Sequence, residues 1–444
     1  MLDPSRYPTK KYLHFDHRVN IERVKSYVTS PTRIARHSFL PLIHYVSSFE
    51  KNIGEKNIDF DNRPIKSKDR DIMYAGHLDG HIYKHYSELL NDYYNTFCNR
   101  KKIDECVTAY RNNKPKQSNI DFAADVINTI MEMEKAFILV GDFTHYFDKI
   151  DHSILKNNLK NVLNVKRLDS DWYNVYRSIT KYGYYNKEFI ESMVGNEKIL
   201  KQRGAISFFN QLSDFREFQK NNKVEYNHNC YGIPQGCAIS AVFANVYALN
   251  FDLSLKKIAN EYNGIYRRYS DDFILVLPEK NNTDQMMMSI EKNVRKIAST
   301  QNIEIQEEKT AIYKSEFHKI TNLTSNETDH LDYLGFVFDG STVRMRGKSP
   351  YKFYRRAKIL IGISKSVKSK KQLDKLPYRK SIYKLYTDLG ESKVGRFSFI
   401  DYAKKAQRKF DLISPKTQNL MMTQIKNRKK KIEKMLGIKI HTKK

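Results

Sequence analysis

Two adjacent carboxylates, Asp271 and Asp272, lie between two short runs of strand-forming residues. Residues 264–268 (Gly-Ile-Tyr-Arg-Arg) and 273–277 (Phe-Ile-Leu-Val-Leu) read as β-prone runs, and only a tight turn fits between them. A hairpin of this kind would present both acids at its tip, where divalent cations can bind carboxylate oxygens. Acidic residues also occur in turns for conformational reasons, so the pair alone does not establish a metal site.

Two further segments add to this chemistry. Asp142 ends the apolar run 137–141, which is typical of a buried strand, and supplies a third carboxylate. Residues 232–240 read Gly-Ile-Pro-Gln-Gly-Cys-Ala-Ile-Ser, a glycine- and proline-rich turn that leads into a predicted helix over residues 241–249. The chain therefore orders a strand with an acid, a loop with a glutamine, and a hairpin with two acids.

In this order the three motifs resemble the palm of reverse transcriptases, specifically the bacterial group related to group II introns and retrons. The resemblance extends from about Lys66 to about Lys358, which is more than half of the chain. It implies an α+β fold built like a right hand, with fingers, a palm of antiparallel sheet plus helices, and an α-helical thumb. It also implies an RNA-directed DNA polymerase, which adds deoxynucleotides to a primer 3′ end.

Such a reaction is an in-line displacement at phosphorus, in which two divalent ions about 4 Å apart stabilise the attacking and leaving oxygens. Asp142, Asp271 and Asp272 are the predicted catalytic residues and metal ligands, because Mg²⁺ prefers carboxylate oxygens. The resemblance adds the backbone carbonyl of Phe143 as a further ligand. It implies two Mg²⁺ ions, with Mn²⁺ as an alternative.

The resemblance also assigns side chains to the nucleotide. Phe147 lies where related polymerases hold an aromatic ring beneath the incoming sugar, and a bulky ring there would exclude a 2′-hydroxyl. A phenylalanine is otherwise most often part of a core. Gln235 corresponds to a residue that touches the nucleotide and the template strand. Lys309 corresponds to a lysine near the leaving pyrophosphate, where it would act as an electrostatic stabiliser or an acid.

Lys68 and Arg70 lie in the basic segment 63–72, where related enzymes hold the triphosphate. Arginine binds phosphate through a two-pronged fork, whereas lysine acts as a point charge. A solvated run of charges explains the same residues equally well.

The composition indicates a globular protein that binds polyanions. The 444 residues are 40% apolar and carry a net charge of +28. Residues 351–444 contain 28 Lys and Arg against six Asp and Glu, so +22 of this charge lies there. Such a field attracts nucleic acid or an anionic membrane.

A membrane location is not expected, because no apolar run approaches the roughly 18 residues needed to span a bilayer. The first six residues do not begin like a secretory signal. The four cysteines show neither zinc-site spacing nor a disulfide framework. We therefore expect a cytoplasmic protein.

The chain is predicted to divide into three parts. Residues 1–135 form the fingers, and residues 136–345 form the palm with a helical insertion around 169–229. Residues 346–444 form a basic helical thumb and a C-terminal RNA-binding region. The boundary near residue 345 is marked by a sharp change to lysine-rich helix formers.

Residues 73–83, 109–111, 232–236 and 334–336 look like those of the defence-associated, abortive-infection group of bacterial reverse transcriptases. This subfamily implies four kinds of partner: an RNA template, the DNA product, dNTP substrates and a cognate noncoding RNA. The oligomeric state stays open. The alternatives are a retron-type enzyme, an RNA-binding maturase or scaffold, and template-independent synthesis primed by the protein. The three aspartates argue against a scaffold, which has no need of them.

Overall fold

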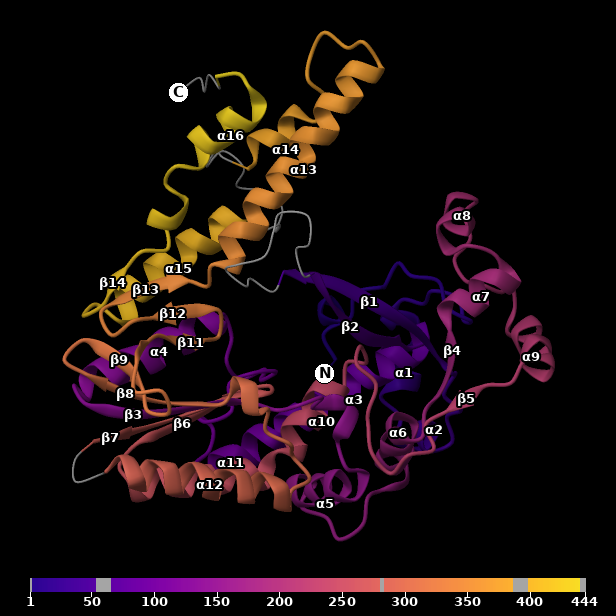
Figure 1. The fold of residues 1–444 in the computed structure, drawn as a ribbon. Helices are drawn as coiled ribbons and strands as arrows, with labels where there is room; N and C mark the ends of the chain where they lie inside the picture. Colours follow the sequence, from indigo (N-terminus) through magenta and orange to yellow (C-terminus); the bar gives the residue numbers. More distant parts are fainter. Residues whose placement is uncertain (1, 53–64, 280–282, 386–397, 440–444) are drawn as a thin grey trace. The chain divides into compact units, whose positions relative to one another are not determined.

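The computed structural model describes residues 2–52, 65–279, 283–385 and 398–439, and for residues 49–52 and 65–68 it describes the backbone alone. The chain forms two compact units, each assembled from segments far apart in the sequence (Figure 1). The N-terminal unit contains Met1–Asn113, Phe143–Lys256 and Val294–Gln306. The C-terminal unit contains Lys114–Asp142, Lys257–Asn293 and Glu307–Lys444.

The N-terminal unit combines helices with a four-stranded sheet. Its helices are α1 (Ile21–Val28), α2 (Pro31–Ala35), α3 (His77–Arg100), α5 (His152–Leu163), α6 (Ser170–Thr180), α7 (Lys187–Val194), α8 (Glu197–Gln202), α9 (Leu212–Asn221) and α10 (Ser240–Tyr247). Its sheet has the order β2-β1-β4-β5, made by β1 (Leu42–Asn52), β2 (Ile65–Tyr74), β4 (Gly183–Asn186) and β5 (Glu225–Tyr226). The insertion predicted over residues 169–229 contains α6 to α9 together with β4 and β5.

Helix α3 begins where a residue distant in sequence satisfies its first amides. The Asp16 carboxylate accepts hydrogen bonds from the backbone N–H of His77 at 2.9 Å and of Leu78 at 3.0 Å. The first amides of a helix have no partner within the helix, and a negative charge there also complements the helix dipole. Gly76, the residue before α3, allows this approach, because a Cβ there would lie 3.1 Å from Asp16 Oδ1. The N-terminal segment therefore holds the start of α3.

The C-terminal unit is organised around a six-stranded antiparallel sheet of order β10-β9-β8-β3-β7-β6. Its strands are β3 (Ala136–Asp142), β6 (Ile265–Tyr269), β7 (Asp272–Pro278), β8 (Ala311–Glu316), β9 (Lys319–Asn322) and β10 (Thr328–Asp329). β3 and β7 are neighbouring interior strands and are buried along almost their whole length, which explains their uninterrupted apolar sequences. Helix α4 (Asn119–Glu132) packs its apolar face into the same core.

The hairpin predicted around the adjacent acids is confirmed. β6 and β7 pair in antiparallel register with Tyr269 opposite Asp272, which leaves Ser270 and Asp271 as the two-residue turn. Ser270 has a φ of 62°, and a positive φ at the first turn position is typical of two-residue hairpins.

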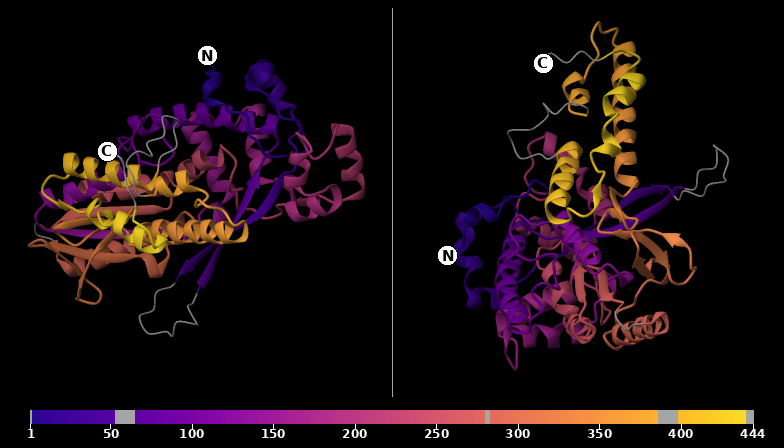
Figure 2. Two further views of the ribbon diagram at one scale, coloured as in Figure 1. Left: turned by 90° about the horizontal axis from the view of Figure 1, so that it is seen from above. Right: turned by 90° about the vertical axis from the view of Figure 1, so that its left-hand side faces the viewer.

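A second, smaller sheet follows in the C-terminal unit, with the order β11-β12-β13-β14. Its strands are β11 (Leu331–Tyr333), β12 (Phe336–Phe338), β13 (Thr342–Met345) and β14 (Gln418–Asn419). The helices after it are α13 (Lys348–Lys370), α14 (Arg379–Tyr383), α15 (Phe399–Ile413) and α16 (Arg428–Leu436). α13 packs against α16, and α15 packs on α4 (Figures 1 and 2). Lys409 of α15 forms an ion pair with Asp121 of α4 at 2.7 Å.

The chain passes from one unit to the other within two helices, α11 (Leu249–Glu261) and α12 (Asp284–Thr300), and also after Asn113, Asp142 and Gln306. Helices and sheets with mainly antiparallel pairing occur together in both units, with parallel pairs only between β1 and β4 and between β13 and β14 in the described residues, which confirms the predicted α+β class. Across the described ranges, every helix is too short or too polar to cross a membrane.

Gly141 is required by the pairing of β3 with β7. It lies opposite Phe273, and a Cβ at Gly141 would lie 2.4 Å from the buried Phe273 ring. We expect Gly141→Ala to lower the free energy of unfolding by about 1–3 kcal/mol through overpacking. Phe273→Leu should relieve part of this cost, so a double-mutant cycle in urea should show favourable coupling between the two substitutions.

Gly362 provides the control, because nothing lies within 4 Å of a Cβ added to it in α13. Gly362→Ala should leave stability unchanged or raise it by up to about 1 kcal/mol, as expected for alanine in a helix. A Gly141→Ala protein as stable as the wild type would contradict the assigned packing.

His14 makes the stability of the protein pH-dependent. Its side chain is fully buried, and burial lowers its pKa from 6.5 to about 4. The unfolded chain therefore binds a proton between these values while the folded chain does not, so stability falls as pH drops through this window. The loss approaches about 3 kcal/mol at 1.36 kcal/mol per pKa unit. Urea unfolding from pH 7.5 to 4 should show a shallower loss for His14→Gln, whereas the exposed His17→Gln should follow the wild type.

Candidate active site

The antiparallel pairing of β3 with β7 brings two of the predicted aspartates together. Asp142, the last residue of β3, lies directly opposite Asp272, the first residue of β7. Residues opposite one another in an antiparallel pair have Cα atoms about 4.5–5.5 Å apart. Asp271 precedes Asp272 in the turn, so all three carboxylates are gathered at one end of the two central strands.

Burial and mutual repulsion raise the pKa of Asp272 to about 7. Burial is the largest cause, and the charges of Asp271 and Asp142 add to it. Arg346 and Lys309 act in the opposite direction. The site is therefore rich in negative charge that nearby cations offset only in part.

Lys309 reaches this site from the segment just before β8, the strand that pairs with the other side of β3. It ends the short helix η3 (Glu307–Lys309), and the following strand β8 pairs with β3 so that Ala311 lies opposite Val140. Its Nζ lies 2.9 Å from Asp142 Oδ2. The structure thus brings Lys309 to the aspartates.

Two arginines at the site were missed from the sequence. Arg268 is completely buried, and its guanidinium donates a hydrogen bond of 2.8 Å to the carbonyl of Ser270 in the hairpin turn. Arg346 follows β13 and is held by Asp332, whose Oδ1 lies 2.5 Å from its guanidinium. Residues 264–268 gave no signal beyond strand propensity, and Arg346 was one of many cations in a basic region. A buried arginine is unusual, but which side chains are buried depends on the tertiary fold and cannot be read from the sequence.

The Pro-Gln-Gly loop lies in the N-terminal unit and is docked on the end of β2. The carbonyl of Gln235 accepts a 2.7 Å hydrogen bond from the N–H of Met73. Gly236 has a φ of 125°, and a Cβ there would lie 2.3 Å from the carbonyl oxygen of Met73. Only glycine allows this close approach, which explains the residue in the motif.

Phe147 and Gln235 belong to the same part of the N-terminal unit. Phe147 begins the short helix η2 (Phe147–Lys149), is half-buried, and its carbonyl accepts a 3.0 Å hydrogen bond from Ile233 of the loop. The Gln235 amide donates to Asp148 Oδ1 at 3.4 Å. Two segments that are distant in sequence are joined here by backbone and side-chain contacts.

The remaining predicted residues also lie in the N-terminal unit. Arg70 is exposed on β2 opposite Ser47. Lys68 lies on the same strand, with its backbone opposite Phe49, but its side chain is outside the described residues. Phe143 is buried and forms a bridge to Ile305. The predicted site residues therefore form two groups, one in each unit, and Asp142, Asp271, Asp272 and Lys309 make up the C-terminal group.

In the described part of the chain, no three Asp, Glu, His or Cys side chains converge closely enough to enclose a metal ion. The donor set nevertheless fits a hard divalent cation, since it consists of carboxylate oxygens with few neutralising neighbours. Burial raises the pKa of Asp272 most, and Asp271 and Asp142 raise it further, and a bound cation would offset both effects by stabilising the ionised carboxylate.

Solved structures that the chain resembles include telomerases from yeasts. It is 10% identical to apo telomerase from Candida tropicalis truncated from its C-terminal domain, with a TM-score of 0.43, covering 72% of this chain and 59% of that one. It is also 10% identical, with a TM-score of 0.43, to telomerase from Candida albicans in complex with a TWJ fragment of telomeric RNA, covering 94% of this chain and 66% of that one. The chain thus spans about three fifths to two thirds of these proteins, and at such TM-scores the likeness carries no weight in the assignment.

The family comparison is more direct. Residues 83–338 match the model described as reverse transcriptase (RNA-dependent DNA polymerase). The match spans more than half of the chain and includes Asp142, Gln235, Asp271, Asp272 and Lys309. The chain therefore belongs to the reverse transcriptase family of RNA-directed DNA polymerases.

Proposed function

We propose that this chain carries out RNA-directed DNA synthesis at Asp142, Asp271 and Asp272. The observation that supports this most strongly is the register of β3 and β7, in which Asp142 lies opposite Asp272 and next to the turn that holds Asp271. A fold needs no cluster of repelling, half-buried carboxylates for stability, and the raised pKa of Asp272 reflects the cost of burying a carboxylate there, to which Asp271 and Asp142 add. Strongly perturbed groups of this kind are concentrated at functional sites.

The three aspartates would hold two divalent ions, Mg²⁺ or Mn²⁺, and the carbonyl of Phe143 would add a ligand. Bound there, such ions would stabilise the charge on the attacking and leaving oxygens during nucleotide addition. Arg268 would act indirectly, because its hydrogen bond to the Ser270 carbonyl holds the turn that presents Asp271.

Lys309 would act on the leaving pyrophosphate. Its ammonium group is exposed and lies 2.9 Å from Asp142, so it remains accessible to an incoming anion. It would stabilise the developing charge or donate a proton to the leaving oxygen.

Four residues of the N-terminal unit would bind the nucleotide. Lys68 and Arg70 would bind the triphosphate, and Gln235 would contact the nucleotide and the template. Phe147 would lie beneath the sugar and exclude a 2′-hydroxyl. The hydrogen bonds that join the Phe147 segment to the Gln235 loop support a shared role for these two residues.

Residues 1–135 would form the fingers, 136–345 the palm, and 346–444 the thumb and RNA-binding region. The charge of +22 over residues 351–444 supports binding of RNA template and DNA product there. The described lysines of α13 and α16 are largely exposed, as phosphate binding requires.

Residues 73–83 and 334–336 support membership of the bacterial defence-associated group, which would act in the cytoplasm with a cognate noncoding RNA. Sequencing the nucleic acid that co-purifies with the active protein would test this assignment. Recovery of one noncoding RNA with its DNA copy supports it, whereas a branched RNA-DNA product would instead support a retron-type enzyme. An RNA-bound protein without DNA synthesis would support a maturase or scaffold.

Removal of the hairpin acids should abolish synthesis. We expect Asp271→Ala with Asp272→Ala to extend no primer, because these charges stabilise the transition state through the bound ions. RNA affinity in a filter-binding assay should persist. Asp374→Ala, which removes an exposed aspartate of the same unit, should retain full extension. Normal extension by the double variant would refute the assigned site.

Sugar selection should depend on Phe147. We expect Phe147→Val to raise the incorporation of ribonucleotides relative to deoxynucleotides by at least about tenfold, which corresponds to about 1.4 kcal/mol of lost discrimination. Single-nucleotide extension with each substrate measures the ratio. Phe189→Val, at an exposed phenylalanine of α7, should leave the ratio unchanged. An unchanged ratio in an active Phe147→Val protein would assign Phe147 to packing.

A further inference from the structure

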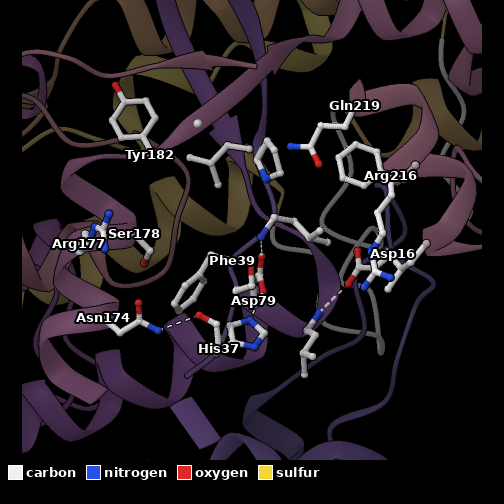
Figure 3. A pocket seen from close by; sticks show the side chains of 18 of the residues that line it. Asp16, His37, Phe39, Asp79, Asn174, Arg177, Ser178, Tyr182, Arg216 and Gln219 are labelled. Atoms are coloured by element: carbon white, nitrogen blue, oxygen red, sulfur yellow. Dashed lines mark hydrogen bonds and ion pairs between the residues drawn. The ribbon is translucent and has the colours of Figure 1, made fainter. Parts of the chain in front are cut away.

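The N-terminal unit contains a pocket of about 720 Å³ that includes none of the residues assigned to catalysis (Figure 3). We call it the α6–α9 pocket. Its walls come from the segment between α2 and β1, the start of α3, the end of α6 with the residues leading to β4, and one face of α9. A volume of this size is within the range of ligand sites.

Three cations line the α6–α9 pocket. Arg177 and Lys181 come from the end of α6, and Arg216 comes from α9. Figure 3 shows Arg177 and Arg216 on opposite sides of the pocket. Among the described residues, no carboxylate lies within ion-pair distance of Arg177 or Arg216, and both side chains are exposed. These two guanidinium groups are therefore available to an anionic ligand.

The two acids of the lining are already engaged by the protein. The Asp16 carboxylate accepts hydrogen bonds from the first backbone N–H groups of α3, as described above. Asp79 accepts a hydrogen bond from the N–H of Leu40 at 2.8 Å and contacts His37 Nε2 at 2.7 Å. Their negative charge is turned toward internal partners, whereas the arginines face the pocket. The pocket therefore presents more positive than negative charge, which favours a negatively charged ligand.

Aromatic and amide side chains lie between the cations. Phe39 is half-buried at the centre of the view in Figure 3, and Tyr182 lies above it. Tyr226 is exposed on β5, and the amide of Gln219 projects from α9. Aromatic faces stack on bases of any sequence, and an amide can bind base edges.

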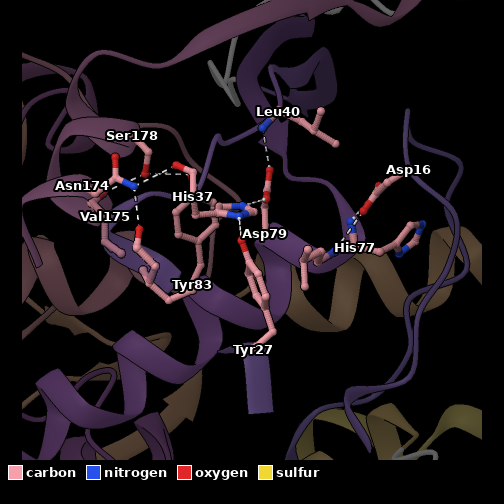
Figure 4. A network of polar contacts seen from close by, with 12 residues as sticks. Asp16, Tyr27, His37, Leu40, His77, Asp79, Tyr83, Asn174, Val175 and Ser178 are labelled. Carbon is pink, nitrogen blue, oxygen red and sulfur yellow. Dashed lines mark hydrogen bonds and ion pairs between the residues drawn. The ribbon is translucent and has the colours of Figure 1, made fainter. Parts of the chain in front are cut away.

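The wall that carries Phe39 is held in place by a polar network (Figure 4). His37 Nδ1 lies 2.8 Å from the Tyr27 hydroxyl, while its Nε2 contacts Asp79. Asn174 of α6 donates to the carbonyls of Ile34 and His37, both at 2.8 Å. This segment is therefore ordered before any ligand arrives, which reduces the entropy lost on binding.

We propose that the α6–α9 pocket binds a segment of single-stranded nucleic acid, with phosphates at Arg177 and Arg216 and a base against Phe39 and Tyr182. Cations on two opposite walls fit a strand that crosses the pocket better than a ligand with one phosphate group. Single-strand sites elsewhere combine a positively charged groove with aromatic stacking platforms in the same way. The proposal goes beyond polymerisation, because it assigns a second contact for template or product outside the catalytic residues.

Photocrosslinking to the full-length protein tests this proposal. The probe is a six-nucleotide oligouridylate with one 4-thiouridine, used with a chelator and without dNTPs, and peptide mass spectrometry locates the adduct. A matched deoxyoligonucleotide with 4-thiothymidine shows whether the site takes RNA, DNA or both. We expect adducts on Phe39, Tyr182 or Tyr226.

Arg177→Gln with Arg216→Gln removes the two pocket cations while keeping polar, hydrogen-bonding side chains. Crosslinking titrations at several salt concentrations give the association constant, and its logarithm plotted against log salt should have a slope shallower by about 1.4, at about 0.7 per single-strand phosphate. Arg167→Gln with Arg203→Gln is the control, because it removes the same charge from exposed positions of the same unit that do not line the pocket. It should leave the slope and the adducts unchanged.

Adducts confined to other regions with both probes, or pocket adducts equally reduced in the control variant, would overturn the proposal. Equal melting temperatures of the two double variants would show that the difference is not one of folding. Because the assay involves no synthesis, its result is independent of the assignment of the aspartates. Failure of crosslinking here and failure of extension in the hairpin variant would be separate findings.

Discussion

The pairing of β3 with β7 is the constraint on which the candidate active site depends. It sets Asp142 opposite Asp272 and, with the two-residue turn between β6 and β7, gathers three carboxylates at one end of the sheet. The same register requires glycine at position 141, because the Phe273 ring occupies the space that a side chain would need. A shift by one residue would turn every side chain of the strand to the other face and separate the acids.

Gathering these acids is unfavourable in the absence of a cation, and the surrounding residues limit the cost. Lys309 approaches from η3 on one side, and Arg346 approaches from the end of β13. Arg268 fixes the turn from within the core. The negative potential that remains would attract a divalent cation, and with it the nucleotide triphosphate. The charge repulsion that destabilises the fold locally therefore favours binding of the ions that the reaction needs.

The N-terminal unit uses a different device, in which side chains distant in sequence satisfy backbone groups. Asp16 holds the start of α3, and Asn174 holds the segment before β1. These hydrogen bonds fix the conformation of the loops that line the α6–α9 pocket and so give the pocket a defined shape. The arginines that line the pocket then decide the sign of the ligand that it can accept.

The sequence by itself determined the strand that ends in Asp142, the hairpin with Asp271 and Asp272, the Pro-Gln-Gly loop and the basic C-terminal region, because each is encoded by neighbouring residues. It also identified Phe147, Gln235 and Lys309 through their positions in motifs, although their roles stay predictions. Only the tertiary structure decided that Asp142 faces Asp272, that Lys309 contacts Asp142, and that Arg268 is buried beneath the turn. These contacts join segments from different parts of the chain. Local propensity carries no information about strand order, register or burial, which depend on how the whole core packs.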